Sequence, residues 1–275
     1  MARVRWSGWL LAVPMAALAV ATVYPLLFTA NVAMKTRREY VLDRFSVVDA
    51  PRWDNLATAW TSVGMARYFL NSAVVVLCSV ALLLLVGSMA GFAVSQLRFR
   101  GSSTLYFVCL AALFIPFQVI MVPLARILAD GGLIDTYPGL VLAYVAQFLP
   151  FTVFLMTSYY RGVPREIVDA ARIDGNSPYG VYRRIMVPIG APALLSVGIL
   201  DALFCWNDVL IALLLMPSAD HRTVMVGVTS LRGQYSADIP TFAAGVLVAA
   251  VPVLVTYLFL QRQIADGVTA GSTKG

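Results

Sequence analysis

Long uncharged stretches alternate with short polar segments along this chain of 275 residues. Five of the stretches exceed the roughly 20 apolar residues that a helix needs to cross the hydrocarbon core of a bilayer. They run over Trp6–Met34, Tyr68–Leu97, Gly101–Ala125, Thr136–Tyr160 and Ile239–Gln261. A sixth stretch of sufficient length, Ile189–Met216, contains Asp201 and Asp208. Because lipid offers no hydrogen-bond partner to open backbone groups, the spanning segments must be helices.

The pattern therefore predicts an all-α, polytopic membrane protein with six transmembrane helices, at about 8–30, 69–96, 104–126, 138–160, 189–216 and 240–261. A single transmembrane domain is expected over residues 1–275. Composition agrees, since 60% of the residues are hydrophobic and 12% are charged, whereas soluble domains have about 25% charged residues. The first apolar run is longer than that of a signal peptide, which favours a retained anchor, although small residues around Ala17–Ala21 leave cleavage open.

The basic residues between the spans indicate an orientation. Six of them follow the first span and would lie on one side of the membrane: Lys35, Arg37, Arg38, Arg44, Arg52 and Arg67. Those that would lie on the other side are Arg3, Arg5, Arg98, Arg100, Arg161, Arg165, Arg172, Arg183, Arg184, Arg262 and Lys274. The positive-inside rule therefore favours cytoplasmic termini. The net charge of +6 is spread over the loops, so a nucleic-acid partner is not expected.

Other features carry less information. Trp53, Leu56, Ala57 and Trp60 recur at helical spacing and predict a short amphipathic helix on the outer membrane interface. Prolines inside the spans are equally compatible with hinges and with ordinary membrane helices. The three cysteines fall in apolar spans and are expected to be small core residues, without a disulfide framework or a metal site. His221, in a polar outer loop, is expected to be solvated, and the chain shows no catalytic constellation.

A charged segment at 161–188 separates the fourth and fifth spans. Pro164 suits the first turn of a helix, and Gly175 suits the left-handed residue that follows a helix end. A second helix is predicted from Ser177 as N-cap and Pro178 as first residue, until Pro188 redirects the chain into the fifth span. Residues at helical spacing, Ile167, Ala170, Ala171 and Asp174, are expected to share one face of the first helix. By shape alone, this helix could equally rest on its own bundle or dock on another protein.

The spacing of this segment resembles a known signature. Asp169-Ala170-Ala171, Gly175, Ile185 and Val187-Pro188 are similar to the E-A-A-x3-G-x9-I-x-L-P motif of ATP-binding-cassette (ABC) importer permeases, with Asp for Glu and Val for Leu. The resemblance extends to Tyr68–Ser72, Ile115-Pro116, Gln118, Pro123-Leu124 and Trp206-Asn207-Asp208. The ending Gln261, Gly267, Thr269–Gly271 and Lys274-Gly275 looks like that of carbohydrate permeases of the maltose-transporter type.

The resemblance implies a sugar-importer permease of the bacterial inner membrane. Such a subunit pairs with a second, homologous permease, two cytosolic ATPase subunits and an extracytoplasmic sugar-binding protein. Contacts with the ATPase are implied for Gly271 and Lys274 of the tail, and for the coupling residues Glu166, Asp169, Ala170, Ala171, Gly175, Ile185 and Pro188. The chain lacks the G-x-x-x-x-G-K-[ST] phosphate loop, so we expect a non-catalytic subunit that binds no cofactor or metal. ATP and Mg²⁺ would be used by the partner ATPase.

Asp201 and Asp208 are unusual because an acid inside the membrane is costly and is often functional. Together with Asn207 they are candidates for the translocation path. The alternative is interhelical hydrogen bonding with Asn71, Gln118 or Gln147, and we favour it for Asp208 and leave Asp201 open.

Other functions remain as alternatives. The nearest is an ABC permease for another solute, such as a polyol, glycerol phosphate or a peptide. An ion-coupled secondary transporter would show inverted repeats and broken helices, which the sequence does not indicate. A membrane scaffold that recruits a soluble protein through 161–188 would show no substrate-dependent ATPase activity.

Overall fold

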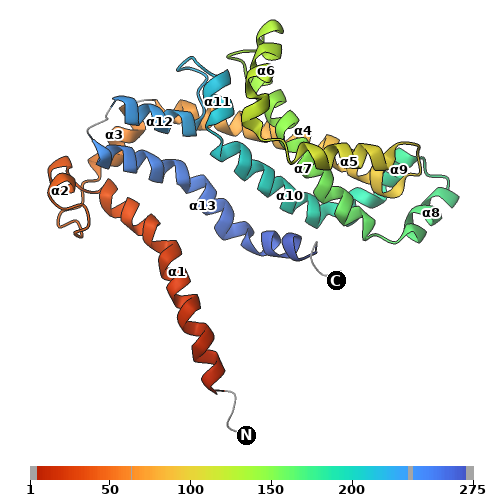
Figure 1. Ribbon diagram of the computed structural model, residues 1–275, viewed down its shortest axis with the longest axis horizontal. Coiled ribbons are helices and arrows are strands. Elements are labelled where there is room, and N and C mark those ends of the chain that lie inside the picture. The colour runs from red at the N-terminus through yellow and green to blue at the C-terminus, as the bar shows by residue number, and fades with distance from the viewer. Residues whose placement is uncertain (1–4, 63, 235–237, 271–275) are drawn as a thin grey trace. The chain divides into compact units, whose positions relative to one another are not determined.

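The computed structural model describes residues 5–62, 64–234 and 238–270, and for 5–11, 232–234 and 261–270 it describes the backbone alone. These residues form helices and contain no strand. Two compact units are present: the first comprises residues 1–66 and 227–251, and the second comprises 67–226 and 252–275. Figure 1 shows the helices of both units.

Four predicted spans are confirmed as long helices. They are α1 (Arg5–Ala33), α4 (Met65–Gln96), α7 (Tyr137–Arg161) and α13 (Ile239–Ala270). Among the described residues, five helices are long and apolar enough to cross a membrane, and a bent helix pair makes a sixth if it counts as one span. The prediction of a polytopic all-α membrane protein is therefore confirmed.

The third span, predicted over 104–126, is broken in the structure. The chain forms α5 (Ser102–Ala112) and α6 (Phe117–Asp130), which are bent by 104° relative to each other. Pro116 lies at the break with an extended backbone (φ −61°, ψ 129°). Proline lacks the N–H that a continuing helix needs, and its ring disfavours a helical conformation in Ile115 before it.

The fifth span also differs from its predicted limits of 189–216. Helix α10 (Val187–Asn207) ends before Asp208, whose backbone is extended (φ −69°, ψ 135°), and α11 (Leu210–Leu215) follows. At its beginning, α10 continues without a break from α9 (Pro178–Val181) and the π-helical turn η1 (Tyr182–Met186).

The prediction that Pro188 redirects the chain is therefore wrong. Pro188 lies in the first turn of α10, directly after η1, where the N–H of Val187 bonds to the carbonyl of Tyr182. A proline ring clashes with the carbonyl four residues earlier in a regular α-helix. A wider π-turn changes the spacing of the carbonyls at that point, so the proline is accommodated without ending the helix.

The first unit contains α1, α2 (Arg37–Leu42), α3 (Asp54–Ser62) and parts of α12 (Val224–Gln234) and α13. Helix α2 begins with a capping box, in which the Thr36 hydroxyl accepts from the Glu39 N–H and the Glu39 carboxylate accepts from the Thr36 N–H. Lys35 is 1% exposed, and its ammonium donates to the Asp43 carbonyl and the Ser46 hydroxyl. The helix predicted near Trp53 is confirmed as α3, whereas its place at an interface stays a prediction.

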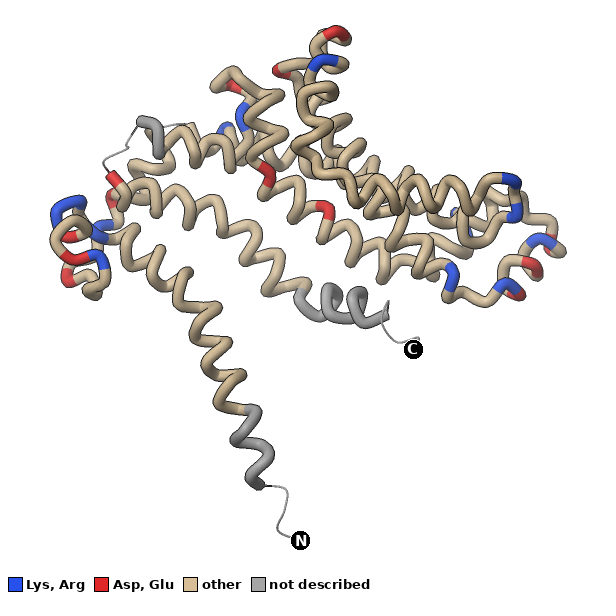
Figure 2. The backbone as a smooth tube through the Cα atoms, viewed as in Figure 1, with Lys and Arg blue, Asp and Glu red and all other residues tan. Residues whose placement is uncertain are grey.

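The second unit has two buried clusters along its helices. One joins α4, α7, α10 and α11 around Val75, Tyr144 and Leu215. The other joins the opposite ends of α4 and α7 to α8 (Arg165–Ile173), α9 and α10, around Phe92, Tyr160 and Met186. Figure 2 shows that the charged residues of this unit gather at the ends of its helices, with few along their length.

Candidate functional site

The segment 161–188 folds as a helix, a tight turn and a second helix, as predicted. Helix α8 covers Arg165–Ile173, and Gly175 follows with φ +83°. The N–H of Gly175 bonds to the Arg172 carbonyl at 3.0 Å, and the N–H of Asn176 bonds to the Ala171 carbonyl at 3.1 Å. This pair of bonds is the Schellman arrangement, which satisfies the last carbonyls of a helix and requires a left-handed residue. Glycine adopts that conformation without the strain that a Cβ causes.

The turn is fixed from its other side as well. The Ser177 hydroxyl accepts from the Gly180 N–H at 3.2 Å and caps α9, with Pro178 as the first helical residue. The amide of Asn176 donates to the Ala171 carbonyl at 3.1 Å and accepts from Arg184 at 3.3 Å. The orientation of α8 relative to α9 is thus determined by side-chain and backbone hydrogen bonds within the segment.

The four residues predicted to share one docking face of α8 are divided between two surroundings. Ala171 is 4% exposed and packs into the cluster around Tyr160 and Met186, together with Val168. Ala170 and Asp174 are exposed, and Ile167 is 39% exposed. These positions do follow one side of the helix, but Ala171 at its edge faces the protein's own bundle and is not available for docking. Because α8 is packed on its own bundle through Val168 and Ala171, the face available to another protein is formed by the remaining positions.

The candidate coupling residues accordingly differ in exposure. Glu166, Asp169 and Ala170 are exposed on α8, and Gly175 lies in the exposed turn. Ile185 is half-buried in η1 and packs against the second cluster, while Pro188 is exposed on α10. The structure brings these residues into one continuous segment, and their contact with an ATPase stays a prediction.

Tyr182 connects this segment to the long helix α4. Its side chain is 7% exposed, and its hydroxyl lies 2.6 Å from the Ser88 hydroxyl. Its ring packs against the ring of Phe92, with the centroids 5.6 Å apart. No sequence motif indicates this contact, because Tyr182 and Ser88 are 94 positions apart.

The end of α7 packs against the start of α10 and the end of α4. A Cβ added to Gly190 of α10 would lie 2.8 Å from Cε1 of Tyr160, so the tyrosine ring lies directly on the α10 backbone. The amide of Gln96 donates to the carbonyls of Tyr160 and Val163, at 2.5 and 3.3 Å. Helices α4, α7 and α10 are therefore joined where segment 161–188 meets the bundle.

The two intramembrane acids have partners within this chain. Asp201 has no exposed surface, and one of its carboxylate oxygens accepts from the Thr152 hydroxyl at 2.9 Å. Asp208 accepts from the Tyr144 hydroxyl at 3.1 Å and from the N–H groups of α11, at 3.0 Å for Ala212. Asp208 thus caps α11 and bonds to α7, which is the interhelical role favoured for it.

The predicted partners of Asp208 are wrong. Asn71 instead accepts from the Tyr137 hydroxyl at 2.8 Å and donates to the carbonyls of Asp220 and Arg222. Asn207 is exposed, and its amide donates to the Leu203 carbonyl at 2.8 Å within its own helix. A role of Asp201, Asn207 or Asp208 in the translocation path stays a prediction. Gly271 and Lys274 lie outside the described residues.

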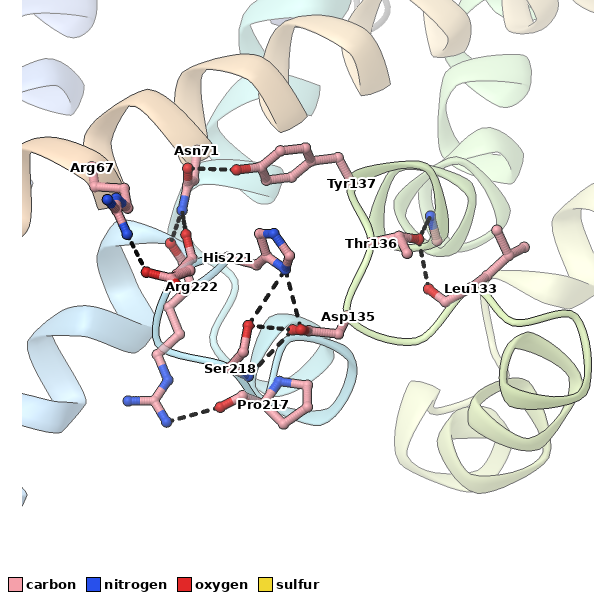
Figure 3. A network of polar contacts seen from close by, with 12 residues as sticks. Arg67, Asn71, Leu133, Asp135, Thr136, Tyr137, Pro217, Ser218, His221 and Arg222 are labelled. Atoms are coloured by element: carbon pink, nitrogen blue, oxygen red, sulfur yellow. Dashed lines mark hydrogen bonds and ion pairs between the residues drawn. The ribbon is translucent and has the colours of Figure 1, made fainter.

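A polar network at the other end of this unit was not foreseen (Figure 3). Nδ1 of His221 lies 3.2 Å from the Asp135 carboxylate, which also accepts from the Ser218 hydroxyl at 2.9 Å. Arg67 forms an ion pair with Asp220 nearby. His221 also contacts the Tyr137 ring, while its side chain is 39% exposed, so this loop histidine is partly solvated as expected but has partners that the sequence did not indicate. The network joins the loops before α7 and after α11 to the start of α4.

The pKa of Asp135 is lowered from its ordinary value. Burial acts to raise it, but the hydroxyl and N–H of Ser218 and the imidazole of His221 favour the ionised carboxylate and outweigh burial. Asp135 has a positive φ of 61°, which is uncommon for a residue with a Cβ. The carboxylate is thus held in place in an unusual backbone conformation by its hydrogen bonds.

Apolar spans, one of them a bent helix pair, and a polar helix–turn–helix packed against the ends of three helices define a polytopic membrane protein with a structured polar segment at one end. The chain matches the family model described as "Binding-protein-dependent transport system inner membrane component" over residues 83–266. This match covers about two thirds of the chain, so the chain belongs to this family of ABC importer permeases.

Individual relatives agree with this assignment. The chain is 34% identical to the diacetylchitobiose uptake system permease protein NgcG of Streptomyces coelicolor, over 92% of this chain and 84% of that protein. It is 32% identical to the arabinooligosaccharides transport system permease protein AraQ of Halalkalibacterium halodurans, over 98% and 97%. A bacterial ABC transporter involved in the import of the acidic polysaccharide alginate has the same fold, with a TM-score of 0.81 at 19% identity over 95% of this chain and 98% of that one.

Proposed function

We propose that this chain is the permease subunit of an ATP-driven sugar importer. It would form half of the translocation path with a homologous permease. The two permeases would together bind two cytosolic ATPase subunits, and segment 164–188 of this chain would dock on one of them. An extracytoplasmic binding protein would deliver the sugar, and both termini would be cytoplasmic. The names of several relatives support a carbohydrate substrate, among them permeases for diacetylchitobiose, arabinooligosaccharides and trehalose. A related solved transporter carries a periplasmic protein bound to an alginate pentasaccharide.

The proposal rests on the packing and hydrogen bonds that fix α8 against its own bundle. Its inner face packs through Val168 and Ala171, its end is fixed by the turn at Gly175, and η1 bonds to α4 through Tyr182. Its outer face presents exposed side chains to a partner, including Ile173 at 87% exposure. A partner that displaces this helix from outside the membrane would also displace α4, α7 and α10, because close-packed protein interiors are barely compressible and transmit strain.

A permease for another solute is the second candidate, since one relative of 28% identity is an osmoprotective compounds uptake permease protein of Synechocystis. Both candidates are tested by reconstituting the chain with its partner permease, ATPase and binding protein in liposomes. Sugar loaded on the binding protein should stimulate ATP hydrolysis and enter the vesicles. Stimulation by a polyol or another osmolyte, with none by sugars, would transfer the assignment to the second candidate. Uptake that requires an ion gradient but no ATP would refute both.

A further inference from the structure

A basic cavity lies at the end of the second unit where α4 ends and α5 begins. Its volume is about 590 Å³, and it is lined by the α4–α5 turn, the end of α7 and the start of α8. Four arginines line it: Arg98, Arg100, Arg161 and Arg165. No acidic side chain is among its lining residues, and none of the four forms an ion pair with a side chain that the structure describes.

The remaining lining groups suit an anion with several oxygens. The hydroxyl-bearing residues Ser102 and Ser103 line the cavity at the first turn of α5. The N-cap of α5 is Gly101, which supplies no side chain to the N–H groups of that turn. A helix N-terminus adds a positive potential to that of the arginines. Guanidinium groups bind phosphate oxygens through paired hydrogen bonds, so a phosphate group matches this lining.

The surroundings favour a lipid over a dissolved ion. The cavity lies where two apolar spans end, α4 at Gln96 and α7 at Arg161, which is the expected depth of lipid headgroups. Within two turns of the cavity, α5 exposes large apolar side chains, Leu105, Phe107 and Val108, at 44%, 66% and 60%. An acyl chain can lie along these side chains while its headgroup lies among the arginines.

A water-soluble partner suits this place less well. An ATPase that bound in the cavity would also face the apolar surface of α5, which a soluble protein surface does not match. A neighbouring cavity of about 140 Å³ shares Arg98 and Arg165 but also contains the Asp169 carboxylate. The larger cavity, which lacks an acid, is therefore the better anion site.

We propose that this cavity binds the phosphate headgroup of an anionic phospholipid. Basic pockets between transmembrane helices on the cytoplasmic side bind such headgroups. The assignment to the cytoplasmic leaflet rests on the orientation given under the proposed function, whereas binding itself does not. Because Arg165 is the first residue of α8, the bound lipid would touch the start of the coupling helix.

The test is native mass spectrometry of the full-length chain, purified alone or within its complex, titrated with phosphatidylglycerol and with phosphatidylcholine. The wild-type chain should prefer phosphatidylglycerol. Replacing Arg98→Gln and Arg100→Gln together should reduce this preference by roughly fivefold for each arginine, as expected for basic groups at an anionic surface. The matched control, Arg37→Gln with Arg38→Gln, removes the same charge from exposed positions of α2 and should keep the preference.

Several outcomes would overturn the proposal. An equal loss in both double variants would indicate a non-specific charge effect, and an unchanged preference in the Arg98/Arg100 variant would exclude the cavity. Binding of inorganic phosphate without any preference between the two lipids would indicate a site for a dissolved anion. Capture of the ATPase, and not of lipid, by a photoreactive group at Phe99 would assign the cavity to a protein interface. If Arg98→Gln/Arg100→Gln fails to fold, Arg161→Gln alone serves as the variant, with an expected loss of roughly fivefold for this one arginine. None of these measurements requires transport, so their failure is distinguishable from failure of the proposed function.

Discussion

Replacing Tyr182 with phenylalanine removes the hydroxyl that connects segment 161–188 to α4. The hydroxyl of Tyr182 lies 2.6 Å from that of Ser88 in a buried environment. The substitution keeps the ring that packs against Phe92. It leaves Ser88 with a partner, because the Ser88 hydroxyl also donates to the Leu84 carbonyl of its own helix. The loss is therefore limited to one hydrogen bond.

The net value of such a hydrogen bond is about 1 kcal/mol. This energy corresponds to about a fivefold change in the equilibrium between the connected and disconnected arrangements, since about 1.4 kcal/mol corresponds to tenfold. If force passes through this connection, Tyr182→Phe should raise the amount of ATP hydrolysed for each sugar imported by up to this factor. The free energy of unfolding should fall by about 1 kcal/mol at most.

The assay is paired measurement of ATP hydrolysis and sugar uptake in liposomes that contain the assembled transporter. Tyr257→Phe serves as the matched control, because its side chain on α13 is 53% exposed. A double-mutant cycle with Ser88→Ala separates the bond from other effects of each substitution. Additive effects of the two substitutions, or an unchanged ratio of ATP to sugar in Tyr182→Phe, would refute the reasoning.

Three further predictions concern other parts of the second unit. Gly175→Ala should reduce sugar-coupled ATP hydrolysis, because a backbone φ of +83° costs a residue with a Cβ about 1–2 kcal/mol, although the space around it is open. Gly175→Asn should be better tolerated, and equal activities of the two variants would contradict this prediction. Ala171→Glu should lower the thermal stability of the transporter, because the Ala171 side chain is buried. Ala170→Glu should leave stability unchanged and weaken co-purification of the ATPase, because Ala170 is exposed, and the reverse pattern would show that the two faces of α8 are wrongly assigned. Because the pKa of Asp135 is lowered, its ionised form contributes fully to stability above the ordinary pKa of 3.8, and this contribution is lost as the pH falls below that value. Asp135→Asn should remove this acid-dependent loss in thermal denaturation measured over a pH series, and identical pH profiles of the two proteins would refute the role of the carboxylate.

Much of the fold follows from the sequence because membrane spans are a one-dimensional property. An uncharged run of sufficient length identifies a helix whatever lies next to it, and α4 and α7 begin and end within a few residues of their predicted limits. The turn at Gly175 and the cap at Ser177 were equally predictable, because both are local: each depends on hydrogen bonds within about five residues.

The features that were missed depend on contacts between distant residues or on choices between local alternatives. Pro116 lies at a break between two helices, whereas Pro188 follows a π-turn inside a continuous helix and Pro150 lies within α7, and the sequence around each proline does not distinguish these outcomes. The burial of Ala171 depends on which side of α8 meets the bundle, which periodicity alone does not fix. The contact between Asp135 and His221 joins loops that are 86 positions apart (221 − 135), so no local pattern could predict it.

The central claim is that segment 164–188 receives force from an ATPase on another polypeptide. A photoreactive amino acid at Ile173, which is 87% exposed on α8, tests this claim in the assembled transporter, with Trp53, 62% exposed, as the control position in the first unit. We predict that Ile173 captures the ATPase subunit and that Trp53 does not. Capture of the extracytoplasmic binding protein from Ile173, or of the ATPase from Trp53 alone, would contradict the account.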